Sequence, residues 1–142
     1  MADVTIVANS VVAANANTTI ARGIAGATIT AGQAVWADPG ANYQIKPAIA
    51  TNVIQATNTL GIALNGAAVG QPIAYATAGD VTFNSAFVQA TVYVLSGANA
   101  GGVAPSADLD SSSGTNYGTV LGISTLATNL RVGLISSGIL NP

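Results

Sequence analysis

Cysteine, histidine and glutamate are all missing from the 142 residues of this chain. Without cysteine there is no disulfide bond, thiolate metal site or cysteine nucleophile. Without histidine the chain lacks the commonest general base and the commonest metal ligand. The ionisable side chains other than the tyrosines are two arginines, one lysine and five aspartates: Arg22, Lys46, Arg131, Asp3, Asp38, Asp80, Asp108 and Asp110. This inventory predicts a protein that is not an enzyme and that holds no cofactor or metal.

Charge of either sign is scarce. Charged residues make up 6% of the chain, against roughly 25% in ordinary soluble domains. A small isolated domain usually stays soluble and unassociated through mixed surface charge. We therefore expect either that partner proteins cover much of the surface or that neutral polar side chains form it. The net charge of −2 and three scattered cations make no phosphate-binding patch, so no nucleic-acid partner is expected.

Long apolar runs are also missing, although half of the residues are hydrophobic. No stretch approaches the roughly 20 apolar residues that a membrane-spanning helix needs. The segment Met1–Val4 shows neither the basic region nor the apolar region of a secretory signal. The sequence therefore predicts a soluble protein that is made in the cytoplasm and has no membrane partner.

What the chain does contain is a strand-and-turn rhythm. Short runs of Val, Ile and Thr are broken by Gly, Asn, Pro or Asp about every 8 to 12 residues, as in a β-sandwich or barrel. One short helix is possible at Ala48–Ala56, and Asn65-Gly66 predicts a tight type I′ hairpin. Asp38-Pro39-Gly40 predicts another turn. The predicted strands are Val4–Ala8, Thr18–Arg22, Ala34–Ala37, Leu60–Leu64, Ile73–Thr77, Val81–Phe83, Thr91–Leu95, Thr119–Thr125 and Asn129–Ser136.

Four blocks of sequence recur in the same order at an offset of about 57 to 61 residues. The aligned blocks are Ala34–Asn42 with Thr91–Asn99, Lys46–Ala48 with Ala104–Ser106, Leu60–Ala63 with Leu121–Ser124, and Pro72–Gly79 with Arg131–Gly138. Constant order and near-constant offset indicate an internal duplication. The prediction is an all-β fold in which two similar units, about 31–80 and 88–139, share one compact barrel or sandwich over 31–142. Residues 1–30 would form an extended N-terminal arm with the first strands.

The sequence gives little support for a site that binds a metal ion or a small molecule. Asp108–Gly114 begins like a calcium-binding loop, but Ser113 stands where the loop needs glycine and Thr119 where it needs a bidentate glutamate. A polar surface loop is the better interpretation. Trp36 and Tyr93 occupy matched positions of the duplication, which favours packing in the core over stacking against a sugar.

Four stretches carry a resemblance to a known family: Ile24–Val35, then Leu60–Leu64 with Gly70–Ile73, and Thr91–Leu95. They resemble the small capsid decoration (cement) proteins and short head proteins of tailed bacteriophages, over roughly residues 20 to 138. The resemblance implies β-rich domains, often homotrimers, that sit on the capsid exterior and bridge neighbouring major capsid subunits. It also implies an N-terminal arm that becomes ordered on the capsid.

The expected function is therefore that of a virion structural protein that stabilises a phage head through contacts with the major capsid protein. The residues expected to contact the capsid or another subunit are Val4, Ile6, Val11, Ile20, Arg22 and Arg131. Two alternatives stay open: a phage tail, fibre or adhesin-like module, and a carbohydrate-binding β-barrel in which Trp36 and the tyrosines stack against sugars.

Overall fold

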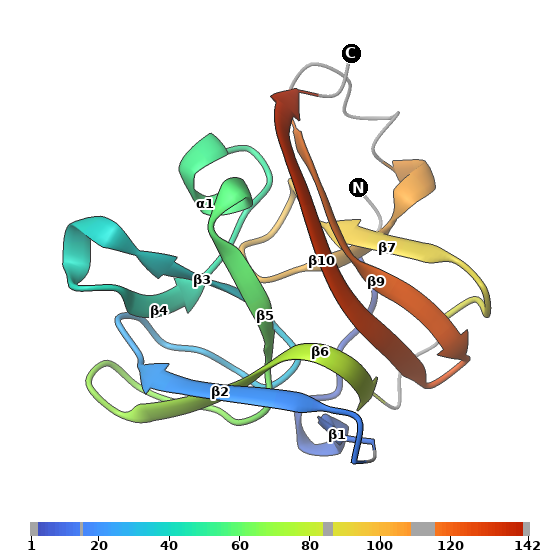
Figure 1. Cartoon of the computed structure of the whole chain (residues 1–142), viewed down its shortest axis with the longest axis horizontal. Coiled ribbons are helices and arrows are strands. Elements are labelled where there is room, and N and C mark those ends of the chain that lie inside the picture. Colours follow the sequence, from blue (N-terminus) through green and yellow to red (C-terminus); the bar gives the residue numbers. More distant parts are fainter. Residues whose placement is uncertain (1–2, 15, 84–86, 109–115, 141–142) are drawn as a thin grey trace.

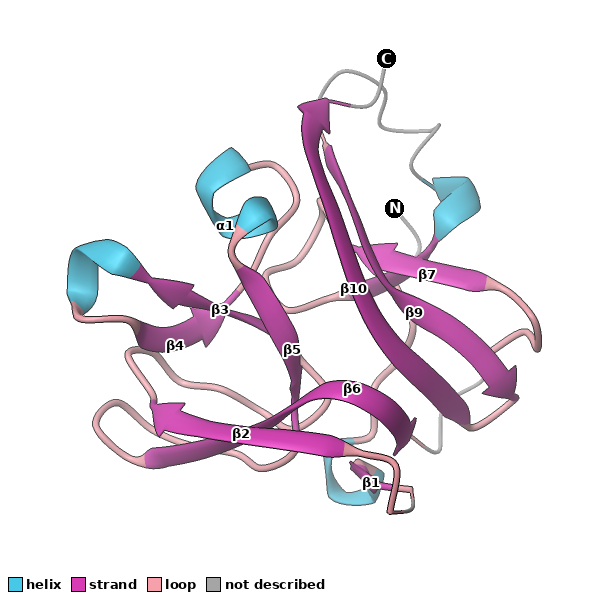
Figure 2. Cartoon of the chain, in the orientation of Figure 1, coloured by secondary structure: helices cyan, strands magenta, loops and turns pink. Residues whose placement is uncertain are grey.

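The computed structural model describes residues 3–14, 16–83, 87–108 and 116–140, which form a curled antiparallel sheet shaped like a half-barrel (Figure 1, Figure 2). The all-β prediction is confirmed. The strands are β1 (Val12–Ala13), β2 (Thr19–Ile24), β3 (Ala34–Asp38), β4 (Gln44–Pro47), β5 (Thr59–Ala63), β6 (Pro72–Thr82), β7 (Val92–Leu95), β8 (Val103–Pro105), β9 (Tyr117–Leu126) and β10 (Asn129–Leu140). Helix α1 (Val53–Thr57) and 3₁₀ turns at Ala8–Ser10 and Pro39–Ala41 lie in the connections.

The sheet is organised around β6. Both β2 and β10 pair with Ala78 of this strand, so they lie on its opposite edges. β5 lies on the same edge of β6 as β10. Ala76 pairs with Ile20 of β2 on one edge, so its pairing with Ile62 of β5 is on the opposite edge, where β10 also pairs. Figure 1 shows β5 and β10 rising apart from β6. From this junction the order continues through β5, β3 and β4 on one side and through β10, β9, β7 and β8 on the other.

These two halves of the sheet repeat the same connections. In the first half β3 lies between β4 and β5, and in the second half β7 lies between β8 and β9. The last strands of the halves, β6 and β10, pair with each other. Two glycines occupy matching places: a Cβ on Gly61 would lie 2.0 Å from the carbonyl oxygen of Ala76, and one on Gly122 would lie 2.1 Å from that of Arg131. The two halves thus share one order of strand connections, and the duplication of the sequence stays a prediction.

The strand pairing also changes two of the four sequence alignments. Val35 pairs with Pro47 and Tyr93 pairs with Pro105, so Tyr93 takes the place of Val35 and not of Trp36. In the same way Arg131, which the sequence aligns with Pro72, takes the place of Ala76. Alignment of short Ala- and Gly-rich blocks misses such shifts because many registers score alike.

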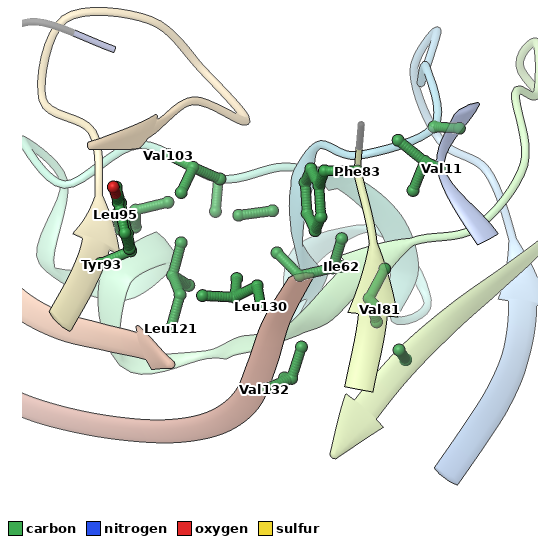
Figure 3. Packing of buried hydrophobic residues seen from close by; sticks show 14 of the residues in the cluster. Val11, Ile62, Val81, Phe83, Tyr93, Leu95, Val103, Leu121, Leu130 and Val132 are labelled. Carbon is green, nitrogen blue, oxygen red and sulfur yellow. The ribbon is translucent and has the colours of Figure 1, made fainter. Parts of the chain in front are cut away.

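The main core lies between the two halves (Figure 3). Ile62 and Phe83 from the first half meet Leu121 and Leu130 from the second, and each of these side chains is fully buried. Phe87 stacks edge-to-face on Phe83 and on Tyr93, with ring centroids 5.2 and 4.8 Å apart. A smaller cluster on the other face of the first half contains Ile29, Val35, Ile45, Ile73 and Tyr75. The main core therefore needs side chains from both halves.

The N-terminal segment is extended, and it lies on its own domain. The Val4 amide donates a 2.7 Å hydrogen bond to the carbonyl of Val103 in β8. The Asp3 carboxylate accepts hydrogen bonds from Ser96, at 2.6 Å, and Asn99, at 2.9 Å. β2 pairs along its whole length with β6. The predicted arm thus covers part of the domain, which leaves fewer of its side chains available to a neighbouring molecule.

Two predictions about strands were wrong. Residues of the predicted strand Val4–Ala8 form no strand, and a 3₁₀ turn begins at Ala8. The predicted strands Ile73–Thr77 and Val81–Phe83 form one strand, β6, which continues through Gly79. Gly79 has a φ of 91°, and a Cβ there would lie 2.3 Å from the carbonyl oxygen of Asn17. Glycine at this position allows the strand to continue where another segment crosses it closely.

The predicted type I′ turn at Asn65-Gly66 was also wrong, because it needs positive φ at both residues and neither has it. Instead the Asn65 side chain accepts a 2.7 Å hydrogen bond from the Ala74 amide and closes a longer loop between β5 and β6. The helix begins at Val53 and not at Ala48, because the Asn52 side chain caps it by accepting from the first backbone amides.

Candidate interaction surface

The six residues expected to contact partners do not gather in one place. Val4, Ile6 and Val11 face the main core, where Val11 is 3% exposed. The remaining three lie on the outside of the domain. Ile20 and Arg22 belong to β2, and Arg131 belongs to β10. The structure therefore divides this set into three side chains that hold the N-terminal segment down and three that are open to solvent.

Arg131 makes an ion pair at the junction of β6 and β10. Its guanidinium donates to both carboxylate oxygens of Asp80, at 2.8 and 3.0 Å. These hydrogen bonds raise the pKa of Arg131 above its ordinary value, so the side chain stays cationic. Asp80 is 6% exposed and also bonds to the segment before β2: Asn17 donates to its carboxylate and Thr18 donates to its carbonyl. Asp80 thus ties three segments of the chain together.

This network leads to a stability prediction. Replacing Asp80 with asparagine keeps the shape of the side chain but removes its negative charge. The carboxylate that accepts from Arg131 and Asn17 becomes an amide, which is itself partly a donor. We expect the free energy of unfolding to fall by about 2 kcal/mol, below the value for a fully buried pair because the Arg131 side chain is 59% exposed. Urea denaturation measures the change.

The matched control is Asp38→Asn, which removes the partner of Lys46 in a second ion pair among the described residues. Lys46 lies 2.8 Å from Asp38, and both side chains are partly exposed. The hydrogen bond from Lys46 lowers the pKa of Asp38, so this carboxylate stabilises the fold at neutral pH and stops doing so as the pH falls through its lowered pKa. We expect a smaller loss than for Asp80→Asn. Equal losses at the two sites would contradict the role given to Asp80.

The outer face of β2 carries a short apolar stripe with one cation at its centre. Ile20, Arg22 and Ile24 point outward, and the two isoleucines are 41% and 46% exposed. Ala21 and Gly23, which alternate with them, are turned toward the domain. No carboxylate of the described residues lies within ion-pair distance of Arg22. The stripe therefore presents apolar surface and an unbalanced positive charge side by side.

Large apolar side chains are exposed over much of the described surface. They are Val7, Val12, Ile20, Ile24, Tyr43, Val53, Ile54, Val69, Val88, Ile123, Leu126, Ile135, Ile139 and Leu140. The most exposed is Ile139, at 71%. Sequence reasoning missed nearly all of them, since a positive mean hydropathy does not tell which apolar residues the fold leaves outside.

Five of these side chains belong to α1 and to the C-terminal half of β10: Val53, Ile54, Ile135, Ile139 and Leu140. The two elements are in contact, because the Ser136 hydroxyl donates a 3.0 Å hydrogen bond to the carbonyl of Ala56. We call this group the α1–β10 tip. The α1–β10 tip is a second group of exposed apolar side chains, in addition to the stripe on β2.

The described surface offers little to a small ligand. No pocket opens on it, and no three carboxylates of residues 3–14, 16–83, 87–108 and 116–140 converge to hold a metal. Of the predicted polar surface loop Asp108–Gly114, residues 109–114 lie outside the described residues. Trp36 is 6% exposed and Tyr93 is 2% exposed, so both pack in the core, and the Tyr93 hydroxyl accepts from the Val88 amide. Of the described helices, none is long and apolar enough to cross a membrane.

Comparison with protein-family models, with curated proteins and with solved structures gave no match to this chain. Function is therefore inferred from the chemistry of the residues and from the fold.

Proposed function

We propose that this chain is a capsid decoration protein of a tailed bacteriophage. In this role it is a virion structural protein, made in the host cytoplasm, that binds the exterior of the phage head as a homo-oligomer, with a trimer favoured. Its partner is the major capsid protein, and it acts neither on nucleic acid nor on membranes. It stabilises the shell because many copies each bury surface across the seams between capsid subunits.

One observation carries this proposal: large apolar side chains lie exposed on a surface that has almost no charge to keep molecules apart. Two of the three cations are already used inside the chain, in the pairs with Asp38 and Asp80. Burying a large apolar side chain completely stabilises a complex by roughly 1.5–3 kcal/mol. A surface of this kind is favourable when a partner covers it and promotes association when it is left open.

The structure argues against a sugar-binding barrel more than against a tail, fibre or adhesin-like module. A sugar-binding barrel loses two of its candidates, because the rings of Trp36 and Tyr93 lie in the core, while Tyr43 stays exposed. A tail, fibre or adhesin-like module would use the same neutral, apolar surface, and it differs from a decoration protein in how copies join. A fibre requires head-to-tail contacts that continue, whereas a decoration protein forms closed oligomers.

The test is binding to empty heads. We expect the purified protein to co-sediment with expanded, undecorated heads assembled from the major capsid protein of the same genome, and to raise the temperature at which those heads melt. An excess of unlabelled protein should displace the labelled protein, which shows that the sites can be saturated. A monodisperse monomer that stays in the supernatant would contradict the proposal, and filaments in negative stain would favour the fibre interpretation.

A further inference from the structure

The backbone of β2 leaves one edge of the sheet unpaired. Ala74 of β6 directs both of its backbone groups toward the β5 side: its carbonyl accepts from the Leu64 amide, at 2.8 Å, and its amide donates to Asn65, at 2.7 Å. Arg22 pairs directly opposite Ala74. In an antiparallel ladder two opposite residues point their backbone groups either toward each other or both away. The amide and the carbonyl of Arg22 therefore point to the open edge, as do those of Ile20 two residues earlier, whereas beside Ile24 the bridge between Ala25 and Ile45 brings β4 against this edge.

Two other outer strands, β4 and β8, are protected. The carbonyl of Ile45 in β4 accepts from the Gly26 amide at 2.8 Å, and the carbonyl of Val103 in β8 accepts from the Val4 amide at 2.7 Å. Each of these two strands also ends in a proline, which cannot donate to an added strand. β2 has no proline, and its ladder is with β6, while the bridge between Ala25 and Ile45 brings β4 against its C-terminal end. Its edge is open to an added strand beside Ile20 and Arg22.

The side chains of β2 indicate what kind of strand fits there. Arg22 lies between two exposed isoleucines, Ile20 and Ile24. A second copy of β2, added antiparallel and centred on the same residue, would place Arg22 opposite Arg22, and like charges directly opposite are unfavourable. The charge thus opposes self-pairing through this edge. It favours a different segment with a carboxylate at the central position and apolar neighbours on either side.

We propose that the edge of β2 is a site of β-strand addition for an extended segment of a partner protein. The segment would pair with the backbone groups of Ile20 and Arg22 that point to the open edge, place an aspartate or glutamate opposite Arg22, and cover Ile20 and Ile24. Main-chain hydrogen bonds supply affinity in this mode of recognition, and the side chains supply specificity. This inference rests on the proposed function, in which the segment belongs to the major capsid protein.

A model peptide tests the edge without any capsid. The probe is a nine-residue capped peptide of alternating threonine and valine with aspartate at its centre, and its control has lysine there instead. We expect the aspartate peptide to protect the Ile20 and Arg22 amides from hydrogen exchange, whereas the Ala21 and Gly23 amides, which face β6, are protected already. No added protection at Arg22 at millimolar peptide, or equal binding of the two peptides, would overturn the proposal.

A charge-reversal variant supplies the second arm. Arg22→Glu should weaken binding of the aspartate peptide on the order of tenfold, and it should prefer the lysine peptide. Because Arg22 is exposed and makes no ion pair with described residues, the melting temperature of the variant should match that of the unaltered protein. If the variant binds the two peptides as the unaltered protein does, the role of Arg22 is refuted.

Heads separate this inference from the proposed function. If the unaltered protein pellets with heads and Arg22→Glu pellets equally well, the decoration function stands and the β2 edge is not its docking site. If the variant stays in the supernatant, the edge is the docking site. If the unaltered protein itself fails to pellet, the decoration function fails, and the peptide titration alone decides whether the edge accepts a strand.

Discussion

Replacing Gly61 with alanine is expected to lower the free energy of unfolding by about 3 kcal/mol, at the upper end for an overpacked interior. The new Cβ would lie 2.0 Å from the carbonyl oxygen and 2.8 Å from the carbonyl carbon of Ala76. These are backbone atoms of the neighbouring strand, so no side chain can move aside to make room. β5 would have to separate from β6 where Ile62 and Ala76 pair. Urea denaturation followed by circular dichroism measures the loss.

Gly133→Ala is the matched control, since it makes the same chemical change in another strand of the sheet. A Cβ on Gly133 of β10 would have no atom within 4 Å. We expect its unfolding midpoint to stay close to that of the unaltered protein. Gly122→Ala should instead behave like Gly61→Ala, because its Cβ meets the carbonyl oxygen of Arg131 at 2.1 Å. A Gly61→Ala protein as stable as Gly133→Ala would contradict the strand packing described for β5 and β6.

A chain cut after residue 89 is expected to be unfolded or aggregated. The cut removes β7 to β10, and with them Leu121 and Leu130, which fill the space beside Ile62 and Phe83 (Figure 3). It also removes β10 from residues 78–82 of β6, which keep only β1 and the start of β2 on their other edge. The first half keeps only its smaller cluster, on the opposite face. Size-exclusion chromatography and far-ultraviolet circular dichroism of the fragment report whether it folds.

The complementary fragment provides the control for this truncation. Residues 90–142 added to residues 1–89 bring the missing side of the main core, so a mixture should regain cooperative unfolding even though neither piece has it alone. A fragment 1–89 that is monomeric and melts cooperatively by itself would show that the first half closes its own core. The idea of a shared core would then be wrong.

Much of this fold could be predicted from the sequence because β-branched runs and turn residues alternate so regularly. The strands predicted at Ala34–Ala37, Leu60–Leu64 and Thr91–Leu95 agree with β3, β5 and β7 within one or two residues. β4 and β8 were not predicted, since a run of three or four residues that ends in proline gives no periodicity to detect. Asn65-Gly66 shows the limit of local rules, because the hydrogen bond from Ala74 fixes that loop from outside it.

The surface was less predictable than the fold. Composition indicated a surface without charge, but which residues it exposes depends on how β6 connects the two halves. Val11 and Ile20 look alike in sequence, yet the first is in the core and the second is outside. Arg22 and Arg131 were equally isolated in sequence, and only the structure shows that Asp80 lies beside one of them. Such differences arise from contacts between distant segments, which a single sequence does not reveal.

The branching of the sheet at β6 has a consequence for how the chain folds. The Arg131–Asp80 pair joins residues that are 51 positions apart, across the ladder that connects β6 to β10. Closing so long a loop costs conformational entropy before the main core gains any burial, and folds built on such distant pairings form slowly. Once formed, the two halves stabilise each other, because unfolding of either half exposes the main core that both share.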